Sequence, residues 1–338
     1  MSSIEVLRRG LLDTIQDQGR LGYQQFGIPC SGAMDNYSLL LGNSIVGNSP
    51  DEAGIEITMT GPRLRFRGDT VFSVTGGTFS PTLNEIQIPM YRAILAKKDD
   101  ILELGTALQG MRGYIAFGGG VQSPKQMGSR STYMLGRIGG LGGNPLQIGD
   151  IVPLGSLPYK HLVCLTKRNA IANDFIPVIE DEVILRVILG PELERFTEQA
   201  VSNFLRYEYC LTSQSNRMGL RLAGEPLSHS RSADILSAGL SLGAVQVPGH
   251  GQPIIMMVDR QTTGGYPRIA NVISVDIPKL AQLRPGGRMR FQAVDVRVAH
   301  SLIAQEDQKI DSLRRAWGST AYQVTMDGQR FSVVVEEI

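Results

Sequence analysis

Most of the chain alternates apolar and polar residues at the two-residue period of β-strands. Between Ile55 and Leu104, six short segments of this kind follow one another, separated by Gly, Pro, Asn and Asp. Such a pattern is typical of antiparallel barrels or sandwiches rather than of alternating strand and helix units. Further strands are expected at residues 4–9, 112–117, 183–189, 254–258, 270–275 and 288–298. We therefore predict a mainly β protein with a few helices.

Helical periodicity is confined to four segments. The first runs to Val46; we expect Ser31 to cap its N-terminus and Asp35 to lie at the positive end of its dipole. The functional alternative is a phosphate or carboxylate bound at the free N–H groups of Ser31 and Gly32. The other helices are expected at residues 191–205, 277–283 and 302–317, and a hairpin around Asp327-Gly328 follows the last of them.

The length of the chain favours two domains. The chain has 338 residues, which exceeds the size at which one hydrophobic core keeps growing with chain length. A second core is therefore expected. Residues 157–177 show little periodicity, which places the junction there. We predict an N-terminal domain at residues 1–175, a C-terminal domain at 176–300, and a C-terminal helix and β-hairpin at 301–338.

Composition argues against several classes of function. The net charge is only +1, and no Lys/Arg block suggests nucleic acid or an acidic membrane as a partner. The start resembles no signal peptide, and no apolar run approaches the roughly 20 residues that span a bilayer, so we expect a cytoplasmic protein. Three distant cysteines and four histidines without metal-ligand spacing predict neither disulfides nor a protein metal site. Mg²⁺ carried by a nucleotide would leave no such signature.

The polar residues that follow the apolar run at 254–258 are the first candidate site. They begin at Asp259 and continue into a turn at Gly264 and Gly265, where a ligand can approach the backbone closely. The alternative is a surface loop whose polar groups satisfy only their own backbone. As a hypothesis, Asp259 acts in catalysis, and the substrate is bound by Gln246, Gln261, Thr262, Thr263, Gly264 and Tyr266.

Four other polar segments carry similar chemistry: residues 16–20, 31–35, 128–132 and 213–221. Arginine with a nearby amide or hydroxyl can recognise a carboxylate, a phosphate or an amide. Each of these segments can equally be a solvated turn or, at residues 31–35, a helix cap. The residues predicted for catalysis here are Arg20, Asp35 and Arg217, and those predicted for substrate binding are Gln16, Ser31, Arg130 and Asn216.

Seven short motifs together suggest a family. They are residues 14–20, 31–35, 46–48, 118–120, 128–132, 215–219 and 261–267. With them the chain resembles, over nearly its whole length, the C-subunit family of bacterial 5-oxoprolinase. This family is related to a domain of urea carboxylase and to the antagonist of a sporulation-kinase inhibitor. The resemblance implies two cyclophilin-like β-barrel domains.

The same resemblance implies an enzyme subunit that is inactive alone. Together with a B-type subunit, which binds it directly, and an A-type subunit, it would open 5-oxoproline, a small cyclic amide, to glutamate. ATP, with Mg²⁺ on the nucleotide, is the implied cofactor. Activation of a lactam carbonyl needs groups that stabilise an oxyanion and phosphoryl charge, and arginines and amides are suitable donors.

Two other functions stay open from the sequence. One is a regulatory protein that binds an inhibitor of a sensor histidine kinase. The other is a carboxyltransferase-like subunit that acts on urea or another amide. The predicted C-terminal hairpin is similar to the segment before a biotinyl domain, but no Met-Lys-Met acceptor occurs here. We therefore expect no covalently bound biotin, and carboxyl transfer would need a carrier in trans.

Overall fold

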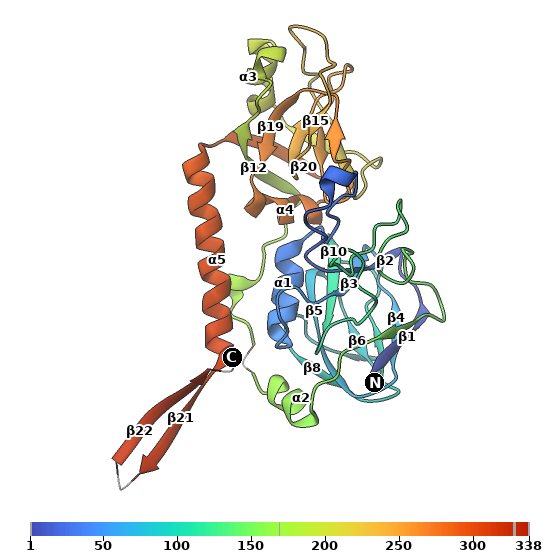
Figure 1. The fold of residues 1–338 in the computed structure, drawn as a ribbon, viewed down its shortest axis with the longest axis vertical. Helices are drawn as coiled ribbons and strands as arrows, with labels where there is room; N and C mark the ends of the chain where they lie inside the picture. Colours follow the sequence, from blue (N-terminus) through green and yellow to red (C-terminus); the bar gives the residue numbers. More distant parts are fainter. Residues whose placement is uncertain (1, 169, 327–328, 337–338) are drawn as a thin grey trace.

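The structure is a computed structural model that describes residues 2–168, 170–326 and 329–336. Two β-rich halves are stacked along the long axis of the molecule, and the long helix α5 (Val296–Gly318) lies beside them (Figure 1). The described residues form many short strands and five α-helices. The prediction of a mainly β chain with a few helices is confirmed.

The first half consists of two antiparallel sheets. One has the order β11-β1-β4-β9-β6-β7, with bounds Ile151–Pro153, Ser3–Arg8, Arg63–Phe66, Ile101–Glu103, Thr82–Leu83 and Ile86–Gln87. The other has the order β2-β3-β10-β5-β8, with bounds Leu12–Gln16, Gly54–Thr58, Gln109–Phe117, Thr70–Thr78 and Ile94–Ala96. Their apolar faces share one core, in which Phe66, Phe72 and Phe117 pack together.

The second half is a closed barrel of seven strands in the order β12-β19-β16-β17-β14-β13-β20. The bounds in that order are Glu182–Leu189, Arg268–Val272, Ala244–Gln246, Ile254–Met256, Gly219–Ala223, Tyr209–Leu211 and Arg288–Ala293. Strands β12 and β20 are parallel, and closure removes the free sheet edges. A ribbon of β15 (Ala238–Gly239) and β18 (Thr263–Gly264) lies outside this barrel. Met34 of the first half inserts into the barrel core.

Helix α1 (Asn36–Ile45) packs against β5 and β10 and begins later than expected. Its cap is Asp35, whose carboxylate accepts a hydrogen bond from the Ser38 N–H at 2.9 Å. The prediction of Ser31 as the cap is wrong. Ser31 and Gly32 have φ of 54° and 93°, so the chain makes a left-handed turn before the helix begins.

The remaining helices correct other expectations. The segment predicted to be the domain junction contains a helix that was not expected, α2 (Tyr159–Thr166), which buries Leu162 and Leu165. The helix predicted at 191–205 is split into a 3₁₀ turn at Leu193–Arg195 and α3 (Glu198–Arg206), because Thr197 caps α3. Helix α4 (Ile277–Gln282) lies where it was predicted. Further 3₁₀ turns are Gln24–Phe26, Asn173–Phe175 and Ser274–Asp276.

The C-terminal segment differs from the prediction only at its start. The strand expected to reach residue 298 ends at Ala293, and α5 begins at Val296. The predicted hairpin is confirmed, because β21 (Ser319–Met326) pairs with β22 (Gln329–Glu336). Its turn, Asp327-Gly328, and residues 337–338 lie outside the described residues. The division into three domains at residues 1–175, 176–300 and 301–338 stays a prediction.

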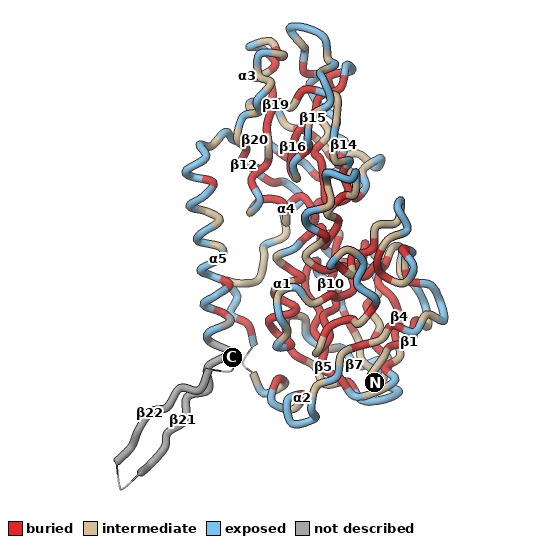
Figure 2. The backbone as a smooth tube through the Cα atoms, in the orientation of Figure 1, coloured by how far each residue is buried: buried red, intermediate tan, exposed pale blue. Residues whose placement is uncertain are grey.

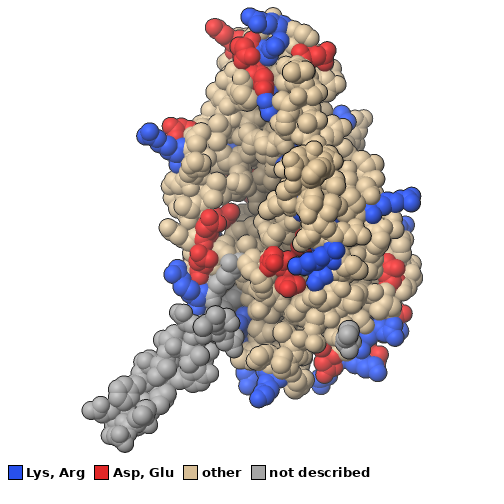
Figure 3. Space-filling model, viewed as in Figure 1, with Lys and Arg blue, Asp and Glu red and all other residues tan. Residues whose placement is uncertain are grey.

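Burial is concentrated inside each half and in the layer where the halves meet (Figure 2). Most of α5 is more exposed. On the face seen in Figure 3, basic and acidic side chains are interspersed. Within the described part of the chain, no helix combines the length and the apolar character needed to cross a membrane.

Candidate functional site

A layer of buried polar side chains joins the two halves, and Arg217 lies within it. Its Nε donates to Asp259 Oδ2 at 2.8 Å, its Nη2 donates to the Gly32 carbonyl at 2.7 Å, and its Nη1 donates to Glu56. With a longer bond from Nη2 to Asp259 Oδ1, four of the five guanidinium N–H groups have a partner among the described residues. Burial alone would lower the pKa of Arg217, but Asp259 and Glu56 raise it above its usual value.

Glu56 of β3 is the carboxylate that anchors this layer in the first half. It is 1% exposed, and its Oε2 accepts hydrogen bonds from the Met34 N–H and the Tyr114 hydroxyl, both at 2.7 Å. A second arginine, Arg112, has its Nε 3.9 Å from Glu56 Oε1. A buried carboxylate is tolerated when it is paired in this way.

Gln282 at the end of α4 makes a second connection between the halves. Its Nε2 donates to Asp35 Oδ2 at 2.7 Å and to the Arg112 carbonyl at 3.0 Å. Its Oε1 accepts from the backbone N–H groups of Met111 and Arg112, both at 3.1 Å. Burial raises the pKa of Asp35, and the nearby charge of Glu56 also acts in that direction.

A cavity of about 470 Å³ opens beside this layer, and we call it the Arg217 cavity. Its polar lining includes Arg112, Asn216, Arg217 and Asp259. The apolar side chains that line it are Leu12, Met111, Tyr133, Met134, Leu135 and Met218. The volume and the few convergent polar groups are typical of a small-molecule site. The Arg217 cavity is therefore the candidate functional site.

The structure brings several predicted site residues together here. Asn216, Arg217 and Asp259 line the cavity, and Asp35 belongs to the buried layer behind it. Ser31 lies nearby, because its N–H donates to the Val258 carbonyl at 3.0 Å. Residues from both halves thus meet at one place.

Gln16, Arg20 and Arg130 belong to an adjoining group of loops. Arg20 donates to the Ser131 carbonyl at 2.6 Å, and Gln16 donates to the Thr132 carbonyl at 3.1 Å. The Arg130 side chain donates to Gln122 Oε1 at 2.7 Å and to the Ser123 carbonyl. Burial lowers the pKa of Arg20, while the negative charge of Asp17 opposes this shift. In this arrangement the three side chains hold loops together.

The turn at residues 261–266 follows Asp259 and belongs to the outer ribbon of β15 and β18. Thr263 and Gly264 pair with Gly239 and Ala238 in the outer ribbon, and Gln246 donates to the Tyr266 carbonyl at 3.1 Å. Gln261, Thr262 and the other members of this group are not among the residues that line the Arg217 cavity. Their predicted contact with substrate stays a prediction.

Four members of the buried layer had no predicted role: Glu56, Arg112, Tyr114 and Gln282. The sequence could have indicated Glu56, because a single carboxylate between Ile55 and Ile57 in an apolar strand suggests a buried charge with a partner. Nothing local indicates Gln282, because its partners are far away in the sequence. Among the described residues, no group of three or more His, Cys, Asp or Glu side chains is placed to hold a metal ion.

Comparison with known proteins defines the class of protein. Residues 26–293 match the family described as carboxyltransferase domain, subdomain A and B, and the chain belongs to this family. The Haemophilus influenzae protein named as the C subunit of 5-oxoprolinase is 37% identical over 302 residues, which are 89% of this chain and 94% of that protein. The Escherichia coli protein of the same name is 36% identical over 314 residues, covering 93% and 98%. The predicted resemblance is confirmed.

A solved structure supports the fold. The urea carboxylase of Kluyveromyces lactis superimposes with a TM-score of 0.87 at 33% sequence identity. The match covers 92% of this chain and 29% of that one, so the chain corresponds to a part of the larger protein. Both halves of the chain therefore have a counterpart in a solved protein.

Proposed function

We propose that the chain is the C subunit of an ATP-dependent 5-oxoprolinase, which opens 5-oxoproline to glutamate together with A-type and B-type subunits. One observation carries this proposal. The chain matches 94% and 98% of the length of two proteins named as the C subunit of 5-oxoprolinase, but only 29% of the urea carboxylase. A separate subunit of this size is thus the better counterpart.

The Arg217 cavity supplies chemistry that suits a small cyclic amide. Asp259 presents a carboxylate whose position is fixed by two hydrogen bonds from Arg217. In the proposed reaction it accepts a hydrogen bond from the lactam N–H and so positions the ring. Water supplies both the hydroxyl that ends on the new carboxyl group and the proton that the leaving nitrogen gains. The guanidinium of Arg112 faces charge that develops on the lactam oxygen. The Arg112 Nε is buried 3.9 Å from Glu56 Oε1 and makes no hydrogen bond among the described residues.

The predicted phosphate-binding residue of this chain is not free to bind a nucleotide. Arg130, which the sequence suggested for phosphate, is committed to Gln122 and Ser123. We therefore propose that ATP and its Mg²⁺ are bound by another subunit, that this chain is inactive alone, and that the complex works in the cytoplasm.

Reconstitution tests the proposal. The chain is mixed with purified A-type and B-type subunits, and ATP hydrolysis and glutamate formation are measured with and without 5-oxoproline. We expect 5-oxoproline-dependent turnover from the three-component mixture and none when this chain is omitted. Equal turnover with and without the chain would refute the proposal.

Carboxyl transfer is the second candidate, favoured by the TM-score of 0.87 with urea carboxylase. It would need a biotinylated carrier protein in trans. Incorporation of labelled bicarbonate into urea, with such a carrier and this chain, measures it directly. Incorporation in the absence of 5-oxoproline turnover would replace the first proposal with this one.

A further inference from the structure

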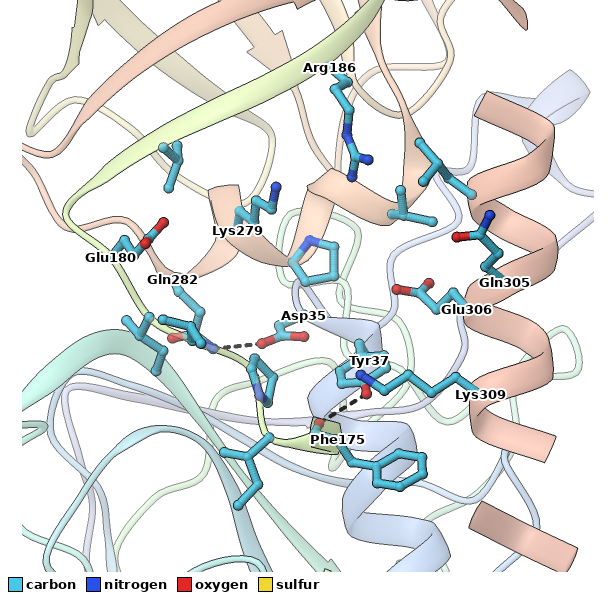
Figure 4. A pocket seen from close by; sticks show the side chains of 18 residues that line it. Asp35, Tyr37, Phe175, Glu180, Arg186, Lys279, Gln282, Gln305, Glu306 and Lys309 are labelled. Carbon is cyan, nitrogen blue, oxygen red and sulfur yellow. Dashed lines mark hydrogen bonds between the residues drawn. The ribbon is translucent and has the colours of Figure 1, made fainter. Parts of the chain in front are cut away.

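A second cavity, of about 440 Å³, lies between α4, α5, the start of α1 and the linker around residues 175–180 (Figure 4). The face seen in Figure 3 is hollowed between the two halves next to α5. We call it the Glu306 cavity after the carboxylate that α5 contributes. Asp35 and Gln282 line it as well, so it borders the buried layer that holds Arg217. Nothing in the proposed reaction uses this cavity.

Opposite charges face each other across the Glu306 cavity without touching. Arg186 of β12 is held by Asp276, which accepts from its Nε at 2.9 Å and from its Nη2 at 2.6 Å. Its Nη1 has no hydrogen-bond partner among the described residues. Within the same part of the chain Glu306 forms no ion pair, and both charged ends point into the space between α4 and α5 (Figure 4).

The ionised Glu306 carboxylate destabilises the folded chain in this position. Burial raises its pKa to about 6, and the negative charges of Asp307 and Asp35 add to the shift. An ionised carboxylate that is partly removed from water gains most from a cationic hydrogen-bond donor. Lys309 lies one turn away, but its ammonium donates to the Asp174 carbonyl and lies over the Phe175 ring.

The other residues that line the Glu306 cavity indicate which class of ligand it could bind. The apolar wall includes Phe175, Val178, Val275, Pro278 and Leu302. A simple anion would meet Glu306, Glu180 and Asp35. A simple cation would meet Arg186 and Lys279, which share Asp276 as their counter-ion. A ligand with one charge of each sign avoids both conflicts. An apolar portion would remove the wall from water.

We propose that the Glu306 cavity binds a free α-amino acid with a small apolar side chain. Its ammonium group donates to Glu306, its carboxylate accepts from Arg186, and its side chain packs against the apolar wall. This assigns the chain a second ligand site, separate from the Arg217 cavity and independent of the proposed oxoprolinase reaction.

Calorimetric titration of the full chain tests the proposal, with the thermal midpoint as a second readout. Alanine, valine, leucine, proline and methionine are titrated in turn, together with leucinamide, which lacks the carboxylate, and isocaproate, which lacks the ammonium group. At least one amino acid should bind, and removal of either charge from leucine should weaken its binding about tenfold or more. The proposal is overturned if no amino acid binds, or if leucinamide or isocaproate binds as tightly as leucine.

A matched pair of variants locates the site. Glu306→Gln removes the carboxylate that faces the cavity, whereas Asp307→Asn removes a neighbouring charge that does not line it. Binding should be lost in the first variant and kept in the second, with both folded by circular dichroism. Equal binding by Glu306→Gln and the unaltered chain, or equal losses in the two variants, would contradict the assignment. Because these experiments measure binding and not turnover, their outcome does not depend on whether the 5-oxoprolinase proposal is correct.

Discussion

Two polar regions of the second half differ in how deeply they are buried and in how far across the molecule their contacts reach. Arg217 is 5% exposed and donates four hydrogen bonds, which reach Glu56 and Gly32 in the first half as well as Asp259. Thr263 is exposed in a ribbon of two short strands outside the barrel. Both belong to loops of amide, hydroxyl and guanidinium groups beside glycine. The difference teaches that burial against the other half, rather than the type of side chain, separates a layer that joins the two halves from an exposed turn.

The largest effect is expected from Arg217→Ala. The change leaves Glu56 and Asp259 as buried carboxylates without their cation, so the free energy of unfolding should fall by about 3–5 kcal/mol. Urea denaturation of the purified chain measures it. A loss below about 1 kcal/mol would show that the layer does not hold the halves together.

Glu56→Gln should have a smaller effect, because the shape of the side chain is kept. The amide still pairs with some donors, but the charge opposite Arg217 is gone, and we expect a loss of about 2–3 kcal/mol. The control is Glu103→Gln, which removes an equivalent charge from a solvent-exposed pair with Arg8. It should cost less than about 1 kcal/mol. Equal losses in the two variants would contradict the comparison.

Glu306 should make the free energy of unfolding depend on pH. A carboxyl whose pKa is raised to about 6 binds its proton more tightly in the folded chain, so stability is highest below the ordinary value of 4.5 and falls as pH rises through 6. Glu306→Gln should remove this decline and gain about 1 kcal/mol near pH 7, after allowance for partial exposure. Other charges act on Glu306 and should stay in place: Asp35, Asp276, Asp307, Arg186 and Lys309. Denaturation at a series of pH values measures the difference, and parallel curves would refute it.

Thr263→Ala should have the smallest effect. Its side chain is exposed, so we expect a change within about 0.5 kcal/mol. Its role in substrate binding stays a prediction, and the turnover of the same variant in the complex would test it. A loss of stability comparable to that of Arg217→Ala would remove the distinction between the two regions.

The sequence predicted much of the fold because the two-residue alternation is local. Most strand positions were found in this way, whereas the end of β20 and the start of α5 were missed where no Gly or Pro separates them. The cap of α1 was misplaced from Asp35 to Ser31, because both are good caps and only the left-handed turn at Ser31 decides between them.

The candidate site was predictable only in part. Arg217 and Asp259 were chosen for their chemistry, and the structure places them in one cavity. Glu56 and Arg217 are 161 residues apart, and no local pattern encodes such a pair. The contacts of Gln282 with Asp35 and Arg112 likewise depend on how the two halves are stacked.

The most direct test of the account is the turnover of the reconstituted complex with Asp259→Asn. This variant keeps the size of the side chain beside Arg217 but removes the carboxylate proposed to accept a hydrogen bond from the lactam N–H. We expect 5-oxoproline-dependent ATP hydrolysis to fall about 100-fold or more, while the complex still assembles. Turnover equal to that of the unaltered complex would contradict the claim that the Arg217 cavity is where the lactam is opened.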